Sequence, residues 1–91
     1  MFVVISYDIG SDQRRLKVAR TLEDFGERVQ YSVFECILQE EDLKRLLQRL
    51  QKLIDPAEDS IRIYKICQKC IKEIKILGAG EITREKDLYI I

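Results

Sequence analysis

The sequence predicts an α+β domain in which two helices cover one face of an antiparallel sheet. Apolar, β-prone segments and amphipathic helical segments follow one another in the order β-α-β-β-α-β, which is the order of ferredoxin-like folds. A further apolar segment near the end of the chain predicts one additional strand. Because a domain of 91 residues buries only about two-thirds of the surface of its unfolded chain, we expect a homodimer packed through its sheets.

The first strand is predicted over residues 2–7, a run that is apolar and β-prone apart from Ser6. A helix follows, which Ser11 or Asp12 can cap and which Gly26 ends. Its apolar residues recur at a spacing of three, with Val18 beside them: Leu16, Ala19, Leu22 and Phe25. This periodicity predicts an amphipathic helix with one face toward the sheet.

Residues 28–38 are strongly β-prone, but their alternation changes phase. Apolar residues occupy positions 29, 31 and 33 in one phase and positions 34, 36 and 38 in the other. The change predicts a bulge or a very tight reversal near Ser32 to Phe34, which would divide the segment into two strands.

A second helix is predicted to start at Glu40 and to end at Asp55-Pro56. Acidic residues precede basic residues along it, as the helix dipole favours. Its leucines form a stripe that we expect to face the sheet: Leu43, Leu46, Leu47, Leu50 and Leu53. Two more strands are predicted, over residues 60–67 and 71–77.

The chain divides into a domain over residues 1–78 and a C-terminal extension over residues 79–91. Gly78 and Gly80 permit a sharp turn or a flexible crossing between them. The apolar end, residues 88–91, is expected to form a strand that crosses to the partner protomer. With both helices on one face of the sheet, Tyr7 or Phe34 is expected on the other face, where a second sheet would cover it.

Charge and hydropathy limit the classes of function. Sixteen basic and sixteen acidic residues give a net charge of zero, which argues against a strongly basic nucleic-acid binder, although residues 61–77 are locally basic. No apolar stretch approaches the roughly 20 residues of a membrane span, and the first strand lacks a basic leader. We therefore expect a cytoplasmic protein with no membrane partner.

Three cysteines, an odd number, fit a reducing compartment. Cys67 and Cys70 have C-x-x-C spacing, but the chain has no histidine, so a zinc site would need a carboxylate or a second subunit. A redox pair would need its first cysteine at a helix N-terminus, whereas this pair is expected to join strands. We therefore expect a structural or incidental role for it.

Asp8 is the first candidate for chemistry, because it stands where the first strand ends. A carboxylate on a rigid strand end that faces solvent can bind a hard cation such as Mg²⁺ through oxygen. Since there is no histidine base, hydrolysis would be metal-assisted. The alternative is that Asp8 simply caps the following turn.

Three cations, Arg14, Arg15 and Lys17, stand at the start of the first helix, where the dipole disfavours positive charge. An anionic partner would favour them there, since helix amides and guanidinium groups suit phosphate oxygens. The alternative is a solvated face on which Asp12 partly offsets the charge.

The ordered set of these segments resembles CRISPR-associated protein 2, the small subunit of the spacer-acquisition machinery. The similarity covers nearly the whole chain through Gly78. It is carried by residues 3–9, the Arg14-Arg15-x-x-Val18-Ala19 helix start, Gly26, residues 29–35, the leucine stripe and residues 59–64. No single segment is diagnostic, but their order is specific.

The resemblance implies a ferredoxin-like homodimer that pairs with the CRISPR-associated integrase, bridges its dimers and lies along captured duplex DNA. It also implies an endonuclease, dependent on Mg²⁺ or Mn²⁺, that acts on single-stranded RNA or double-stranded DNA. Asp8 would be the metal ligand and catalytic residue. The nucleic-acid-binding residues would be Tyr7, Arg15, Lys17, Arg28 and Phe34, together with Arg14 from its helix-start position.

Three points stay open beside this resemblance. Lys17 replaces an arginine of some relatives, which keeps the charge but removes bidentate phosphate recognition. The chain could also be a DNA-binding scaffold without catalysis, or a small ferredoxin-like regulatory module that binds a metabolite at a dimer interface. The C-terminal extension could contact the integrase instead of the partner protomer.

Overall fold

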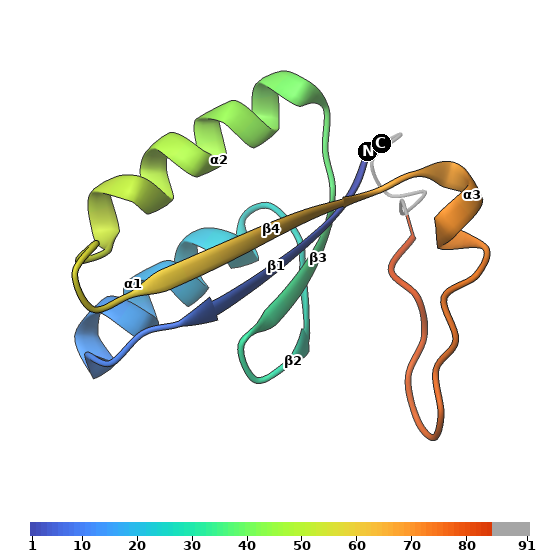
Figure 1. Cartoon of the computed structure of the whole chain (residues 1–91), viewed down its shortest axis with the longest axis horizontal. Helices are drawn as coiled ribbons and strands as arrows, with labels where there is room; N and C mark the ends of the chain where they lie inside the picture. Colours follow the sequence, from blue (N-terminus) through green and yellow to red (C-terminus); the bar gives the residue numbers. More distant parts are fainter. Residues whose placement is uncertain (85–91) are drawn as a thin grey trace.

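The computed structural model describes residues 1–84. The elements follow the predicted order as far as β4 and are shown in Figure 1: β1 (Phe2–Asp8), α1 (Asp12–Glu23), β2 (Glu27–Gln30), β3 (Val33–Ile37), α2 (Glu40–Leu53), β4 (Ser60–Ile66) and α3 (Gln68–Ile71). The predicted α+β class is confirmed. Within this part of the chain, no helix is long and apolar enough to cross a membrane.

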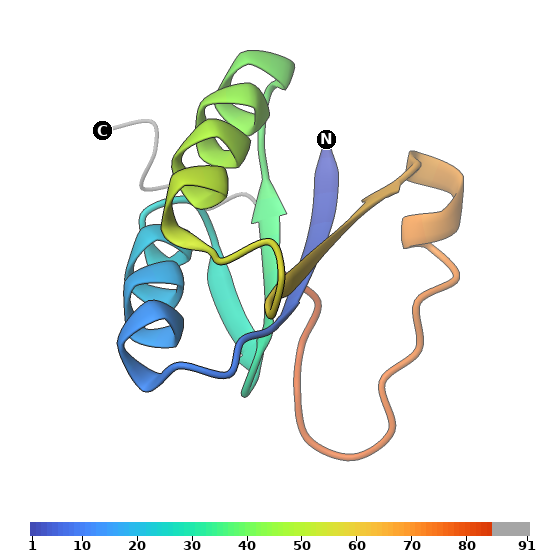
Figure 2. The ribbon, with the colours of Figure 1, turned by 60° about the vertical axis from the view of Figure 1, so that its left-hand side comes forward.

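The four strands form one antiparallel sheet in the order β2-β3-β1-β4, so β1 lies between β3 and β4. Ile5 in the middle of β1 is opposite Phe34 of β3 on one side and Ile63 of β4 on the other. Figure 2 shows α1 and α2 on one side of the sheet, with α3 and the following segment on the other. Among residues 1–84, helices therefore cover one face of the sheet and leave most of the other face uncovered.

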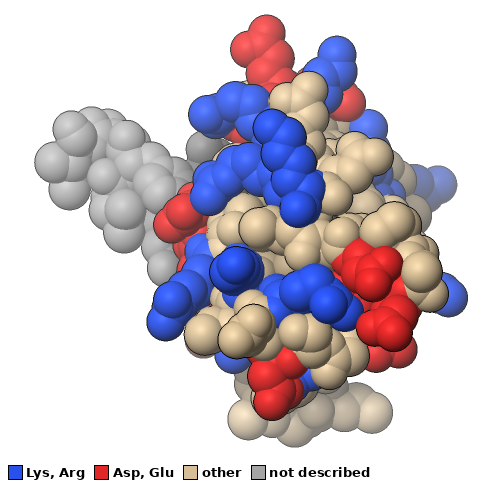
Figure 3. Space-filling model, turned by 90° about the vertical axis from the view of Figure 1, so that its left-hand side faces the viewer, with Lys and Arg blue, Asp and Glu red and all other residues tan. Residues whose placement is uncertain are grey.

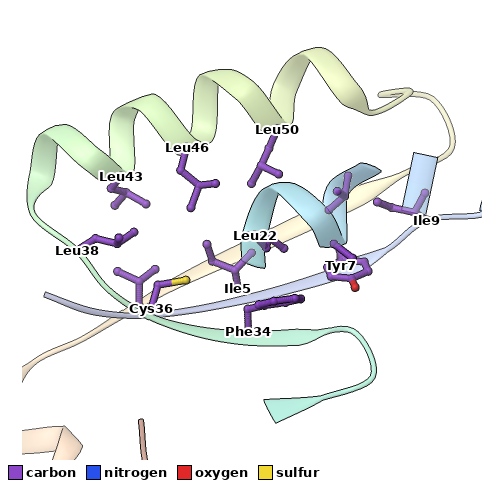
Figure 4. Packing of buried hydrophobic residues seen from close by; sticks show 13 residues of the cluster. Ile5, Tyr7, Ile9, Leu22, Phe34, Cys36, Leu38, Leu43, Leu46 and Leu50 are labelled. Atoms are coloured by element: carbon purple, nitrogen blue, oxygen red, sulfur yellow. The ribbon is translucent and has the colours of Figure 1, made fainter. Parts of the chain in front are cut away.

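The core lies between the sheet and these two helices. Leu43, Leu46 and Leu50 are buried and point from α2 toward the strands in Figure 4, while Leu47 and Leu53 pack at the edge of the cluster. The leucine stripe therefore faces the sheet, as predicted. Buried residues of β1, α1 and β3 complete the core: Val3, Ile5, Tyr7, Val18, Ala19, Leu22, Phe34 and Cys36.

The prediction that Tyr7 or Phe34 lies on the uncovered face is wrong. Tyr7 is 6% exposed and Phe34 is fully buried, both in the cluster beneath the helices. Tyr7 shares the β1 phase of Ile5, and Phe34 is opposite Ile5 in the register, so all three point to the helix side. The uncovered face instead carries the alternate residues, including Val4 of β1 and Tyr64 of β4.

The predicted reversal is confirmed between β2 and β3. Only Tyr31 and Ser32 separate the two strands, and a register shift between Arg28 and Gln30 adds a bulge. Near this pair, Gly26 passes so close to β3 that a Cβ there would lie 2.5 Å from the Glu35 carbonyl oxygen. Glycine is therefore required for this close approach.

The strand predicted over residues 71–77 is wrong. The amides of Ile71, Glu73 and Ile74 donate to carbonyls three or four residues earlier, so local turns satisfy their hydrogen bonds. The chain then runs without strand or helix to Arg84, and the Thr83 amide donates to Glu35 Oε1 at 3.2 Å. The additional strand expected at residues 88–91 lies outside the described residues.

Candidate nucleic-acid and metal site

Asp8 ends β1 on the uncovered face of the sheet, directly opposite Ser60 at the start of β4. Its side chain is exposed. Among residues 1–84 its carboxylate accepts no hydrogen bond and makes no ion pair, so the alternative role as a turn cap has no support. The β1 ladder thus holds an available carboxylate in a fixed position.

Asp59, and not Asp8, accepts a backbone hydrogen bond at the turn that follows β1. Its Oδ1 accepts from the Gly10 amide at 3.4 Å, and its Oδ2 accepts from the Asp55 amide at 2.9 Å. Arg14 donates to it through Nε at 2.7 Å and through Nη2 at 3.2 Å. Its side chain is fully buried. The Arg14 bond, followed by the Asp55 amide, lowers the pKa of Asp59 from 3.8 to about 2.

Intramolecular partners account for the two arginines that begin α1. Arg14 pairs with Asp59 and, at 3.3 Å, with Glu58, so it ties the helix start to the loop before β4. Arg15 donates to the Ile9 carbonyl at 2.7 Å and pairs with Asp12. These groups offset the unfavourable dipole, so an anionic partner is not needed to explain the charges. Lys17 stays exposed on α1.

A hollow of about 300 Å³ opens on the helix side, between α1 and the β2–β3 turn. Its walls include Tyr7, Arg15, Arg28 and Tyr31, together with Asp12, which pairs with Arg15. The Arg28 guanidinium lies 5.3 Å above the Phe34 ring, whose centroid is 6.3 Å from that of Tyr7. The hollow therefore combines cationic groups with aromatic surface, a combination that suits phosphates and bases.

The predicted site residues thus fall on two sides of the sheet. The structure gathers Tyr7, Arg15, Arg28 and Phe34 on the helix side, whereas Asp8 points to the uncovered side. Arg14 is turned toward Asp59 with 29% of its side chain exposed. Figure 3 shows lysine and arginine side chains spread over one end of the molecule, with acidic side chains in several separate groups among and around them.

The metal site that the resemblance implies is incomplete within the described residues of one chain. No group of three or more histidine, cysteine, aspartate or glutamate side chains could hold an ion in residues 1–84. Asp8 offers one carboxylate, with the Ser60 residue opposite. Since protein-bound Mg²⁺ uses one or two carboxylates with water and phosphate oxygens, these residues fit such an ion when a second copy supplies another carboxylate.

Sequence reasoning missed Asp59. The signal was present in the charges: three acids lie between Asp55 and Asp59, and an excess of cations lies at the start of the first helix. Pairing these two anomalies would have predicted the contact between the loop and the helix. What could not be predicted was that Asp59 is the buried member while Glu58 stays exposed.

Comparison with known proteins agrees with this architecture. The family model described as CRISPR associated protein Cas2 matches residues 1–74. The chain is 48% identical to CRISPR-associated endoribonuclease Cas2 1 of Chloroflexus aurantiacus, over all of both chains. It superposes on Streptococcus pyogenes Cas2 with a TM-score of 0.76 at 34% identity, covering 86% of this chain and all of the other.

A larger assembly contains a similar chain. One chain of a partial Cas6-RT-Cas1–Cas2 complex has a TM-score of 0.75 and 31% identity to this one, and 93% of each chain is covered. The resemblance inferred from the ordered segments is therefore confirmed. Together with the four-stranded sheet and the strand-end aspartate, these matches show that the chain belongs to the CRISPR associated protein Cas2 family.

Proposed function

We propose that this chain acts in CRISPR spacer acquisition as a homodimer that binds duplex DNA and bridges the CRISPR-associated integrase, with Asp8 serving a metal-dependent endonuclease activity. One observation carries the proposal: the sheet face that the helices leave uncovered ends on an exposed carboxylate with no partner in residues 1–84. The similar chain in a Cas1–Cas2 assembly supports the integrase as partner.

The uncovered face supports dimerisation. Val4 is only half-buried there, and Tyr64 is 46% exposed although it lies opposite Val4 in the register. A sheet face that leaves apolar side chains accessible among polar ones gains from a second layer. A twofold interface would place the same residues of both copies around one axis, so it would bring the two Asp8 side chains into one interface.

Two Asp8 carboxylates would hold Mg²⁺ or Mn²⁺, with water and phosphate oxygens as the other ligands. The bound ion would lower the pKa of a water molecule and screen the charge that develops on the phosphate. The chain itself supplies rigidity: β1 is hydrogen-bonded on both sides, and Asp59 and Arg15 hold the turn that follows Asp8. Asp8 is thereby fixed before any ion binds.

The helix-side hollow supports nucleic-acid binding. Arg28 is exposed and can reach phosphate oxygens from its walls, while the partly exposed Arg15 would share its guanidinium between such an anion and its partners Asp12 and the Ile9 carbonyl. Tyr31, which is 76% exposed, adds aromatic surface on which an unpaired base could stack, whereas Tyr7 forms part of the wall from its buried position. The relative named as an endoribonuclease supports RNA as a second substrate beside duplex DNA.

Nuclease assays on single-stranded RNA and duplex DNA test the catalytic part. The parent chain should cleave at least one of them in Mg²⁺ or Mn²⁺, and a chelator should stop cleavage. Asp8→Asn should lower the rate by about 100-fold or more if the carboxylate holds the ion. Glu41→Gln, at an exposed acid of α2, is the matched control and should cleave like the parent. An Asp8→Asn variant with the parent rate would remove the catalytic proposal.

A second candidate is a DNA-binding scaffold without catalysis. It is favoured by the sparse set of metal ligands, since no group of three or more cysteine, aspartate or glutamate side chains in residues 1–84 could hold an ion. It predicts that neither parent nor Asp8→Asn cleaves, while both bind duplex DNA equally well. The regulatory-module alternative has no residue in this structure that supports it, and membership of the Cas2 family removes its basis.

A further inference from the structure

Two exposed thiols lie at the junction between β4 and the irregular segment that follows it. Cys67 immediately precedes α3, and Cys70 lies within it. Both side chains are exposed and neither is in a disulfide. The sequence-based expectation that the pair joins two strands is wrong, because a helical turn, not a strand, follows Cys67. The sequence-based argument against a redox role, which was that these cysteines join two strands, therefore does not hold.

The turn brings the two sulfur atoms into each other's neighbourhood. The Ile71 amide donates to the Cys67 carbonyl at 2.9 Å, so residues 67 and 70 belong to the same turn. Cys67 is the extended N-cap residue of α3, and its sulfur is hydrogen-bonded by the amide and the thiol of Cys70, so the two side chains meet at the start of this turn. A disulfide needs Cβ atoms about 3.5–4.5 Å apart, which a local adjustment of the turn would provide. Neighbouring Gln68 and Lys69 are exposed and leave the approach open.

The two thiols also differ in acidity. Hydrogen bonds from the amide and the thiol of Cys70 lower the pKa of Cys67, whereas the Cys67 sulfur raises the pKa of Cys70. An exposed thiol with a lowered pKa is the better attacking group, and the other is suited to resolve the product. The third cysteine behaves differently: Cys36 is fully buried, and burial raises its pKa to about 11.

We propose that Cys67 and Cys70 are a reversible thiol–disulfide site that reacts with low-molecular-weight disulfides. The Cys67 thiolate attacks one sulfur of the disulfide, forms a mixed disulfide and releases one thiol. Cys70 then attacks the Cys67 sulfur, which forms the internal bridge and releases the second thiol. The protein dithiol loses two electrons and two protons, and the two small thiols that are released carry these electrons and protons.

The bridge would restrict the direction that the chain takes after it leaves the sheet. α3 is the only regular element between β4 and Arg84 in the described chain, and the segment after it returns to Glu35 on β3. A covalent link across α3 would hold its single turn closed and restrict the direction in which that segment leaves. The oxidised chain would therefore present the segment in a narrower range of positions than the reduced chain.

Thiol counting with glutathione tests the site on the full chain. Reduced protein is equilibrated with reduced and oxidised glutathione, alkylated under denaturing conditions and weighed intact. We expect two of the three thiols to become unreactive together, with the chain monomeric on a non-reducing gel and without bound glutathione. A chain that keeps three reactive thiols, accumulates mixed disulfide or forms disulfide-linked pairs would overturn the proposal.

Single substitutions separate the roles. Cys67→Ser and Cys70→Ser should each stop at a glutathione adduct on the remaining exposed cysteine, and the variant that keeps Cys67 should form it faster. Cys36→Ser should oxidise like the parent. If two thiols of Cys67→Ser or of Cys70→Ser still become unreactive on oxidation, the bridge involves Cys36 and the assignment is wrong.

Hydrogen exchange measures the structural consequence without reference to any activity. The amides of Ile71 and Glu73, which donate to Cys67 and Cys70 carbonyls at 2.9 and 3.0 Å, should exchange more slowly after oxidation. The same treatment should leave them unchanged in Cys67→Ser. Equal or faster exchange in the oxidised parent would contradict a bridge that holds α3 closed.

Discussion

Arg14 and Asp59, which lie 45 residues apart in the sequence, are joined by a hydrogen bond of 2.7 Å between Nε and Oδ2. The bond links the start of α1 to the loop before β4, and Asp59 also accepts a hydrogen bond from the Gly10 amide. Asp8 and Ser60, the neighbouring pair, are opposite each other in the β1–β4 ladder. The same carboxylate thus closes the turn that follows the candidate metal ligand.

Asp59→Asn should lower the stability of the fold in a pH-dependent way. The folded state holds the pKa of Asp59 at about 2, below its ordinary 3.8, so the ionised carboxylate stabilises the fold above about pH 4. This contribution is lost as the pH falls through the folded-state pKa. Urea unfolding of parent and variant should differ most near pH 7, and the difference should shrink toward pH 2. Glu58→Gln, at an exposed acid, should show a smaller difference. A difference in the free energy of unfolding between parent and variant that stays the same at every pH would contradict the role of the ionised carboxylate.

Gly26→Ala should destabilise the chain strongly. The new methyl group would meet the Glu35 carbonyl and the Cys36 sulfur, and overpacking of this kind costs about 1–3 kcal/mol. Gly10→Ala is the matched control, because nothing lies within 4 Å of a Cβ at that position. Chemical denaturation of both variants is the measurement. Equal unfolding midpoints would show that the close approach of residue 26 to β3 is not a constraint.

Arg28→Ala should weaken the binding of nucleic acid. The exposed guanidinium over Phe34 is the cation that the hollow presents most openly, and each lost phosphate contact lowers the salt dependence of binding by about one unit of log–log slope. Fluorescence anisotropy with duplex DNA over a range of salt concentrations measures both effects. Lys44→Ala on α2 is the control. The same affinity and slope in Arg28→Ala would exclude the hollow as a binding surface.

Tyr64→Glu should shift the chain from dimer to monomer. Tyr64 lies on the uncovered sheet face with 46% of its surface exposed, and a buried carboxylate without a partner there would oppose association. Leu77→Glu removes a large apolar side chain that is 97% exposed and lies outside the sheet, so it should leave the dimer intact. Light scattering coupled to size exclusion reports the mass. A stable Tyr64→Glu dimer would show that the sheets do not meet at this face.

Much of the fold could be predicted from the local sequence, because each of the two helices carries a one-sided apolar pattern and β1 is an apolar, β-prone run. The leucine stripe of α2 and the reversal before Val33 were predictable from local sequence. The segment 71–77 was not: its alternating isoleucines and lysines indicate a strand, but its amides find acceptors within the turns that follow β4. A local pattern cannot show whether a strand has a neighbour to pair with.

The candidate site was predictable in its residue types and less so in its geometry. Asp8 at a strand end follows from the sequence, as does an arginine-rich helix start. That Tyr7 and Asp8 point to opposite faces follows from the strand period, yet which face carries the helices depends on the register of β1 with β3 and β4. The inward turn of Arg14 depends on Asp59, 45 residues away, which no local pattern reveals.

Calorimetric titration with Mn²⁺ tests the central claim, that two copies join through their uncovered sheet faces and share an ion between their Asp8 carboxylates. The account predicts a dimer in solution that binds one ion per two chains, and an Asp8→Asn variant that remains a dimer but binds none. A monomer, one ion per chain, or binding that survives in Asp8→Asn would contradict it.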